Sequence, residues 1–216
     1  MGESVLWEEI SDRDADTDRI ADRVIGDPRL LDDVFAGLDA DTARTKYGCE
    51  KVLRKISEKS PIVLYPHFAF FAGLLDHENN FLKWGAIHTI ANLAAVDSEN
   101  EFEKIFEKYF APIPGPQLIP AANAISGAGK IARAKPELVD KIADELLKVE
   151  SAKYQTAECR NIALGKAITS FNQFYEQITD KEAVLRLVKG QLDNTRNATR
   201  KKAEGFLKKW SDAGFC

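Results

Sequence analysis

The chain has 216 residues, of which 44% are hydrophobic and 30% are charged, a balance that excludes natural disorder and collagen-like repeats. No apolar run reaches the roughly 18 residues of a membrane-spanning helix, so we expect no membrane association. Thirty Lys and Arg residues against 34 Asp and Glu residues give a net charge of −4. This charge argues against a dedicated nucleic-acid binder, because release of phosphate counterions favours basic proteins.

The three cysteines point to a reducing compartment. Cys49, Cys159 and Cys216 form an odd set without CxxC spacing. A disulfide framework or a zinc site is therefore not expected, and the cytoplasm is the predicted location.

Residues 1–26 are predicted to form an acidic amphipathic helix, or more than one, that caps a repeat domain of residues 27–216. Gly26 is expected to end this cap, and Asp27-Pro28 to begin the next helix. Residues 1–41 contain four arginines and thirteen acidic residues: Glu3, Glu8, Glu9, Asp12, Asp14, Asp16, Asp18, Asp22, Asp27, Asp32, Asp33, Asp39 and Asp41. The opposite end is basic over residues 194–210. Two solvated terminal helices explain these charge runs, and head-to-tail association of two copies is the alternative.

An internal repeat runs through the domain. A basic residue recurs at positions 46, 83, 160 and 200, and Pro120 occupies the same slot in the third unit. The chain therefore divides into five units of 37 to 40 residues, and an acidic turn precedes three of the slots, at Asp39, Asp76 and Asp193.

Each unit contains two helical patterns and none with the period of a strand. In the third unit, apolar residues follow the i, i+3, i+4, i+7, i+8 spacing at Phe102, Ile105, Phe106, Tyr109 and Phe110. One helix pair of this length cannot bury its own apolar stripe, so neighbouring pairs are expected to stack.

Local signals place the helix ends and breaks. Ser98 with Glu101 and Thr179 with Glu182 read as capping boxes. Pro28, Pro61 and Pro136 suit first helical turns, and Pro66 is expected to kink the helix at 61–75. That helix is apolar nearly all round, which predicts an interior position.

The proline-rich segment 112–116 (PIPGP) is predicted to be a loop inside the third unit. A boundary between two domains is the lesser alternative, because the repeat step carries across this segment.

These features resemble HEAT repeats within the armadillo-like class. The matching features are a kinking Pro66, acidic turns, and a basic residue early in four of the five second helices, the third unit departing from the pattern with Pro120. The resemblance covers about residues 27–210 and implies an all-α, right-handed α–α superhelix of about five helix pairs. It also implies mainly non-enzymatic binding of macromolecules along a concave surface.

The predicted partner-binding residues all come from the starts of the second helices. They are Lys46, Tyr47, Lys83, Trp84, His88, Arg160, Asn161, Arg200 and Lys201. The basic residues of this set can be interpreted in two ways. They either hold successive units together by hydrogen bonding to the preceding turn, or they present a row of cations to a ligand. Tyr47, Trp84 and His88 likewise suit either interhelical packing or an anchor for a partner.

Searches for catalytic, metal and cofactor motifs find none complete. The Asp12-x-Asp14-x-Asp16 segment lacks the glycine and the final glutamate of a calcium loop. Gly129-Lys130 lacks the rest of a phosphate-binding loop, and His77-Glu78 does not continue into a zinc motif. We therefore expect no cofactor, no metal and no catalytic residue, although a site scattered over several repeats would leave no motif and stays an open alternative.

The sequence predicts a cytoplasmic HEAT-repeat scaffold that binds a partner protein on its concave face. The alternative is a nucleic-acid-binding protein that resembles the HEAT-like alkylpurine DNA glycosylases, with the cationic ladder, the basic tail, and Trp84 or Trp210 as an aromatic contact. No aspartate suited to the catalytic role of those enzymes lies beside Trp84 on a second helix. Self-association through the oppositely charged ends is a third possibility.

Overall fold

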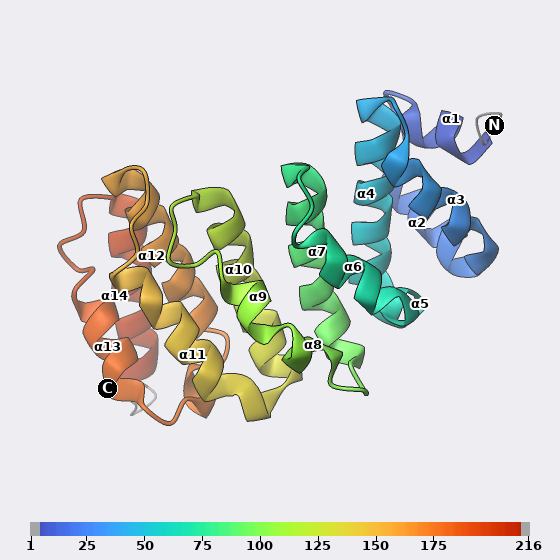
Figure 1. The fold of residues 1–216 in the computed structure, drawn as a ribbon. Helices are drawn as coiled ribbons and strands as arrows, with labels where there is room; N and C mark the ends of the chain where they lie inside the picture. Colours follow the sequence, from blue (N-terminus) through green and yellow to red (C-terminus); the bar gives the residue numbers. More distant parts are fainter. Residues whose placement is uncertain (1–4, 213–216) are drawn as a thin grey trace. The chain divides into compact units, whose positions relative to one another are not determined.

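The computed structural model describes residues 5–212, and within that range it contains α-helices and short 3-10 turns but no strand (Figure 1). The chain divides into two compact units, one ending at Phe102 and the other beginning at Glu103. The expectation of an all-α fold is therefore confirmed. The boundary between the units falls inside a helix, α8 (Glu101–Lys104).

Among its described residues, from 5 onward, the first unit contains seven α-helices before α8. They are α1 (Val5–Ser11), α2 (Thr17–Gly26), α3 (Leu31–Ala36), α4 (Ala43–Lys59), α5 (Pro61–Leu64), α6 (Phe68–Leu74) and α7 (Asn80–Leu93). Short 3-10 turns join them at Pro28–Leu30, Gly37–Asp39 and Tyr65–His67, and a fourth follows α7 at Ala94–Val96.

Up to residue 212, where the described part of the chain ends, the second unit contains the six α-helices after α8. They are α9 (Phe106–Phe110), α10 (Leu118–Ala134), α11 (Val139–Leu147), α12 (Ala157–Phe171), α13 (Lys181–Lys189) and α14 (Asn197–Asp212). Its 3-10 turns are Pro136–Leu138, Lys148–Glu150 and Tyr175–Gln177.

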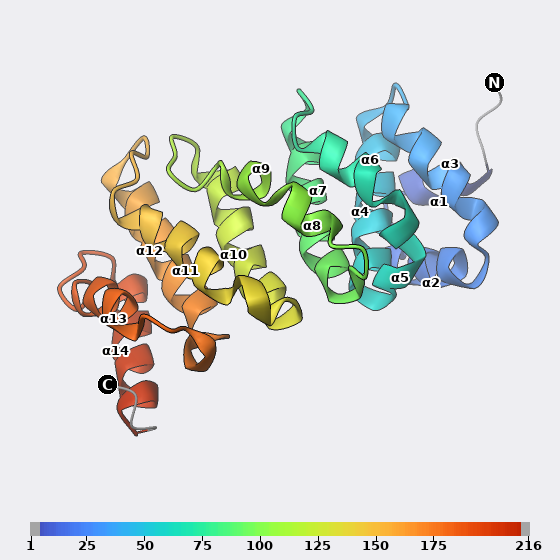
Figure 2. The same ribbon diagram turned by 60° about the horizontal axis from the view of Figure 1, so that its bottom comes forward.

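The five long helices carry the repeat. α4, α7, α10, α12 and α14 begin at residues 43, 80, 118, 157 and 197, which reproduces the spacing seen in the sequence. In the first unit α4 packs between α2 and α7, and in the second α12 packs between α10 and α14 (Figure 2). Shorter helices precede each long one and cover one side of it, so each unit is a stack of helix pairs that share a core.

Proline positions agree with the sequence prediction. Pro28, Pro61 and Pro136 each open a helical turn. Pro66 lies in the 3-10 turn that separates α5 from α6, because proline cannot donate the backbone hydrogen bond that would continue an α-helix. The segment 112–116 connects α9 to α10, and Lys153 N donates to Pro114 O across it (3.0 Å).

Both predicted capping boxes are wrong, because a neighbouring aspartate takes the cap. Asp97, not Ser98, accepts hydrogen bonds from Glu101 N (2.8 Å) and Phe102 N (3.0 Å). Carboxylates stabilise helix N-termini by charge as well as by hydrogen bonding.

At the second predicted box, Asp180 caps α13 by accepting from the backbone N–H groups of Glu182 and Ala183. Thr179 is thereby freed to donate its hydroxyl to Asp140 of α11 (2.7 Å), and its backbone N–H donates to the same carboxylate (2.8 Å). These bonds hold the pKa of Asp140 below its usual value. Thr179 is therefore a link between repeats and not a cap.

The segment 61–75 is less buried than its composition predicts. Leu64, Phe68 and Phe71 lie in the core, but Ile62 is 59% exposed and Phe70 is 41% exposed. The expectation of a fully interior helix is therefore wrong, since α5 and α6 belong to the covering layer and turn one side outward.

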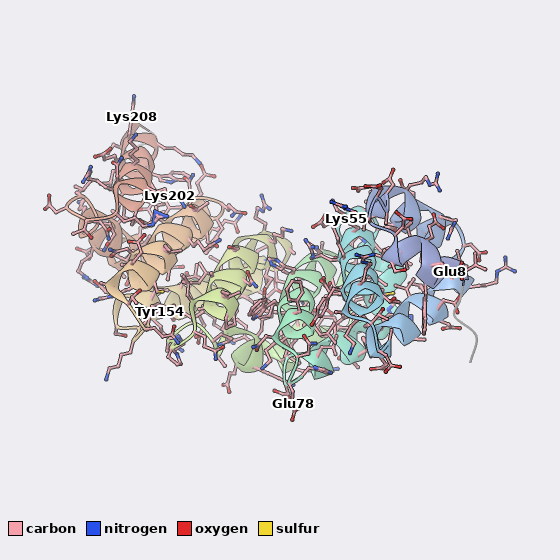
Figure 3. All side chains as sticks on the ribbon, turned by 90° about the horizontal axis from the view of Figure 1, so that it is seen from above. Glu8, Lys55, Glu78, Tyr154, Lys202 and Lys208 are labelled. Atoms are coloured by element: carbon pink, nitrogen blue, oxygen red, sulfur yellow. The ribbon has the colours of Figure 1, made fainter. Side chains whose placement is uncertain are left out.

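Over residues 5–26 the acidic N-terminal region forms two helices, and three of its carboxylates pair with nearby cations. Glu9 of α1 pairs with Arg19 (3.2 Å) and Arg23 (2.7 Å) of α2. In α2, Asp18 pairs with Lys55 and Lys59 of α4, and Asp22 pairs with Lys59. Figure 3 labels Lys55. The Asp12–Asp16 segment forms the turn before α2, where Asp16 caps the helix.

Candidate functional site on the faces of the long helices

A cluster of three aromatic rings lies on α4 and α7 of the first unit. The ring of Tyr47 stacks on Phe81 with centroids 4.6 Å apart and planes inclined by 30°. Phe81 in turn contacts Trp84 at 5.8 Å. Phe81 is 49% exposed, whereas Tyr47 and Trp84 are half-buried. We call Tyr47, Phe81 and Trp84 the aromatic cluster.

The start of α7 positions this cluster. Asn79 caps α7 by accepting from the backbone N–H groups of Phe81 and Leu82, and its side-chain amide donates to the Tyr47 hydroxyl (3.3 Å). The cap fixes the first turn, and with it the side chain of Phe81. The rings are therefore held by secondary structure and not by a loop.

The structure separates the predicted site residues of the first unit into two sets. Phe81, Trp84 and His88 are spaced as i, i+3 and i+7, which places them on one side of α7. Lys46 and Lys83 each precede an aromatic residue by one position, and one step along a helix turns by about 100°. The two lysines therefore do not lie on the same face as the rings, and the basic residues that follow Tyr47 on its own side of α4 are Lys51 and Arg54.

A buried carboxylate underlies this face. Glu50 of α4 is 8% exposed, pairs with Arg54 (3.4 Å), and lies against Gly85 of α7, where a side chain would collide with it. Burial raises the pKa of Glu50, and the nearby cations Arg54 and Lys51 oppose this shift only in part. Gly85 thus allows the two long helices to approach closely around an ionisable group.

In the second unit, the predicted residue Arg160 bonds within its own repeat, and Asn161 links its repeat to the next one. Arg160 donates to the carbonyl of Glu150 in the preceding turn. Asn161 donates to Thr195 (3.0 Å) and accepts from Asn194 (3.1 Å), both in the loop before α14. Asn161 thus resembles Tyr47, which also bonds the loop before the next long helix of its unit.

The remaining predicted residues lie at the start of α14. Arg200 donates to Asn197 within its own helix (3.0 Å), and Lys201 is exposed. Arg160 and Asn161 also line a 550 Å³ hollow together with Lys153, Tyr154 and Thr156. Lys201 is absent from its lining residues, so the predicted residues do not converge on one site in this unit.

Sequence reasoning missed Lys166 of α12 and Lys202 of α14. Lys166 donates to the Ser126 hydroxyl of α10 (3.1 Å), and Lys202 donates to the Gly165 carbonyl of α12 (3.1 Å). Lys130, Lys166 and Lys202 are separated by equal steps of 36 residues, so a second periodic basic position was present in the sequence.

Within residues 5–212, no group of three or more His, Cys, Asp or Glu side chains is arranged to hold a metal ion. Over the same residues, none of the helices has the length and apolar character needed to cross a membrane. Cys49 is buried, and burial together with the nearby Asp33 raises the pKa of its thiol to about 12. This thiol is therefore a poor nucleophile at neutral pH.

Comparison with solved structures agrees with this architecture. A designed armadillo repeat protein aligns over 94% of this chain and 89% of its own, with a TM-score of 0.57 and 17% identity. A computationally designed armadillo repeat protein made for modular peptide recognition aligns over the same shares with a TM-score of 0.58 and 17% identity. An engineered protein aligns over 96% of this chain and 87% of its own, with a TM-score of 0.55 and 14% identity.

These similarities show that the chain has the armadillo/HEAT-like α-solenoid fold. At such identities they establish the fold alone. No protein-family model matches the sequence, and no curated protein matches it.

Proposed function

We propose that the protein is a non-enzymatic repeat scaffold that binds a segment of a partner protein on the exposed face of its long helices. The observation that carries this proposal is the aromatic cluster on α4 and α7. Aromatic side chains held rigidly on a surface are the commonest anchors of protein interfaces, because they bury much area at low cost in conformational entropy.

Basic side chains near the cluster add a polar contribution. Lys51 and Arg54 follow Tyr47 at i+4 and i+7 on the same side of α4. A segment lying along this face would meet aromatic rings first and cations farther along α4. The designed repeat protein for peptide recognition, which shares the fold, supports the same type of ligand.

The test is selection of peptides against the full-length chain. A display library of random dodecapeptides is selected for binding, and the recovered peptides are labelled and titrated by fluorescence anisotropy. Phe81→Ala is expected to weaken binding about 30-fold, the cost of removing a central aromatic anchor worth about 2 kcal/mol.

Phe70→Ala is the matched control, because Phe70 is a similarly exposed aromatic side chain on the covering helix α6. We expect it to leave affinity within about twofold, because Phe70 contacts Phe35 and Phe71 of the covering helices and lies outside the aromatic cluster. Equal losses for the two variants, or a library that yields no specific peptide, would contradict the proposal.

A further inference from the structure

The long helices of the second unit are cationic, and the shorter helices that cover them are not. The helices α10, α12 and α14 contain nine basic residues and three acidic ones. The covering helices α9, α11 and α13 contain five of each. The excess of positive charge therefore belongs to one layer and is not a general property of the unit.

Two lysine side chains bridge neighbouring long helices of this layer, and the Lys166 side chain reaches from α12 to the Ser126 hydroxyl of α10. The Lys202 side chain reaches from α14 to the carbonyl of Gly165, the residue directly before Lys166 (Figure 3). Burial lowers the pKa of Lys202, and the nearby charges of Lys166 and Arg196 lower it further. Neither Lys166 nor Lys202 has a carboxylate within ion-pair distance among the described residues.

The surface beside Lys202 is hollowed. A hollow of 300 Å³ between α12 and α14 is lined by Thr169, Asn172, Lys202 and Gly205, with Ile168 and Phe206 beneath. A side chain added at Gly205 would meet nothing within 4 Å. An extended polypeptide can therefore approach the helix backbones closely here.

We propose that this lysine face, defined by Lys166, Lys202 and the hollow beside Lys202, binds an extended acidic segment of a partner protein. The inference rests on the proposed scaffold function and names the chemistry of the ligand in the second unit. Carboxylates of the segment would supply the counter-charges that the two ammonium groups lack, while its backbone lies over Gly205.

A single-stranded nucleic acid fits this face less well. Binding of single strands combines cations with exposed aromatic rings on which bases stack. The aromatic residues of α14 are Phe206, 2% exposed, and Trp210, 5% exposed, and the indole N–H of Trp210 donates to Asn172. Neither ring is available for stacking.

The acidic N-terminal region of a second copy also fits poorly. Several of its carboxylates are already paired with cations of their own unit, including Glu9, Asp18 and Asp22. These groups lie on helices and not on an extended segment.

The experiment titrates the full-length chain into labelled twelve-residue probes at low salt. The probes are an alternating Glu-Gly peptide, a Lys-Gly peptide of opposite charge, and oligothymidylate. We expect the Glu-Gly peptide to bind most tightly and to lose affinity as salt rises. The variant Lys166→Glu with Lys202→Glu is expected to weaken its binding at least about tenfold, since two attractions become repulsions.

The control variant Lys141→Glu with Lys189→Glu changes the net charge equally on the covering helices α11 and α13. It should leave affinity within about twofold. The milder Lys166→Gln with Lys202→Gln, which retains the aliphatic stems, should give an intermediate loss of about threefold, with the fold checked by circular dichroism.

Equal losses for the two charge-reversed variants would overturn the inference, because net charge alone would then explain binding. Tighter binding of oligothymidylate would assign the face to nucleic acid instead. Light scattering that shows self-association in the wild type but not in the Lys166→Glu, Lys202→Glu variant would identify a second copy as the ligand. If the acidic peptide fails while library peptides still bind in a Phe81-dependent way, only this inference falls, and the proposed function stands.

Discussion

At the scale of single residues, Glu50 is the most consequential ionisable group of the first unit. Its carboxylate is buried between α4 and α7, and burial raises its pKa above the unfolded value of about 4.3. The folded state therefore binds more protons than the unfolded state between these two pKa values. Over that window the free energy of unfolding falls as the pH rises.

Glu50→Gln is accordingly expected to stabilise the protein at pH 7 by about 1 kcal/mol, because the amide carries no charge to desolvate. The gain should vanish near pH 3, well below the unfolded pKa of about 4.3, where Glu50 is protonated in both states. Urea unfolding at the two pH values measures the difference. A variant that is less stable than the wild type at pH 7 would mean that the ion pair with Arg54 outweighs the cost of burial.

The residue scale is also where sequence reasoning was weakest. The basic repeat position does not indicate Phe81, because Phe81 lies two residues before that position on another side of the helix. Tyr47 and Trp84 were identified, but their contact through Phe81 depends on how α4 packs against α7. Such packing cannot be derived from spacing along one chain segment.

At the scale of helices, close contacts depend on glycine. Gly48 of α4 faces Ile10 of α1, and a Cβ at this position would lie 2.5 Å from Ile10 Cγ2 and 3.0 Å from the Ile10 carbonyl oxygen. Because one of these atoms belongs to the backbone, the contact cannot be relieved by a side-chain rotation alone. The sequence shows that residue 48 is a glycine, but it does not show that this glycine packs against Ile10.

Gly48→Ala is therefore expected to lower the free energy of unfolding by about 1–3 kcal/mol, the usual cost of overpacking. Gly205→Ala is the matched control, because it is also helical and a Cβ there meets nothing within 4 Å. It should raise stability by about 0.5–1 kcal/mol, the difference in helix propensity. Chemical denaturation compares the two, and a loss at Gly205 equal to that at Gly48 would remove the steric explanation.

The positions of the helices could be predicted from the sequence, whereas the residues that cap their N-termini could not. Apolar periodicity and Pro66 located the repeats and the break between α5 and α6. Ser98 and Thr179 matched a capping motif, yet Asp97 and Asp180 perform the capping. Sequence motifs cannot rank two adjacent acceptors, because the choice depends on the direction from which the chain enters the helix.

At the scale of the whole molecule, each unit presents a different chemistry on its long helices. The first unit has the aromatic cluster, and the second has the lysine face. A scaffold with two such surfaces can recognise two features of one partner, or two partners, and linking the two contacts increases the overall affinity. The armadillo/HEAT-like fold could be predicted from the repeat spacing. The placement of aromatic rings on one unit and of lysines on the other could not.

Hydrogen–deuterium exchange of the full chain, with and without a library-selected peptide, is the most direct test of whether the long helices bind the ligand. Binding should slow local opening of the helices it covers. We predict slower exchange in α4 and α7 and no change in the covering helices α3, α5 and α6. Protection confined to the covering helices, or no protection anywhere while the peptide is bound, would contradict the assignment of ligand binding to the long helices.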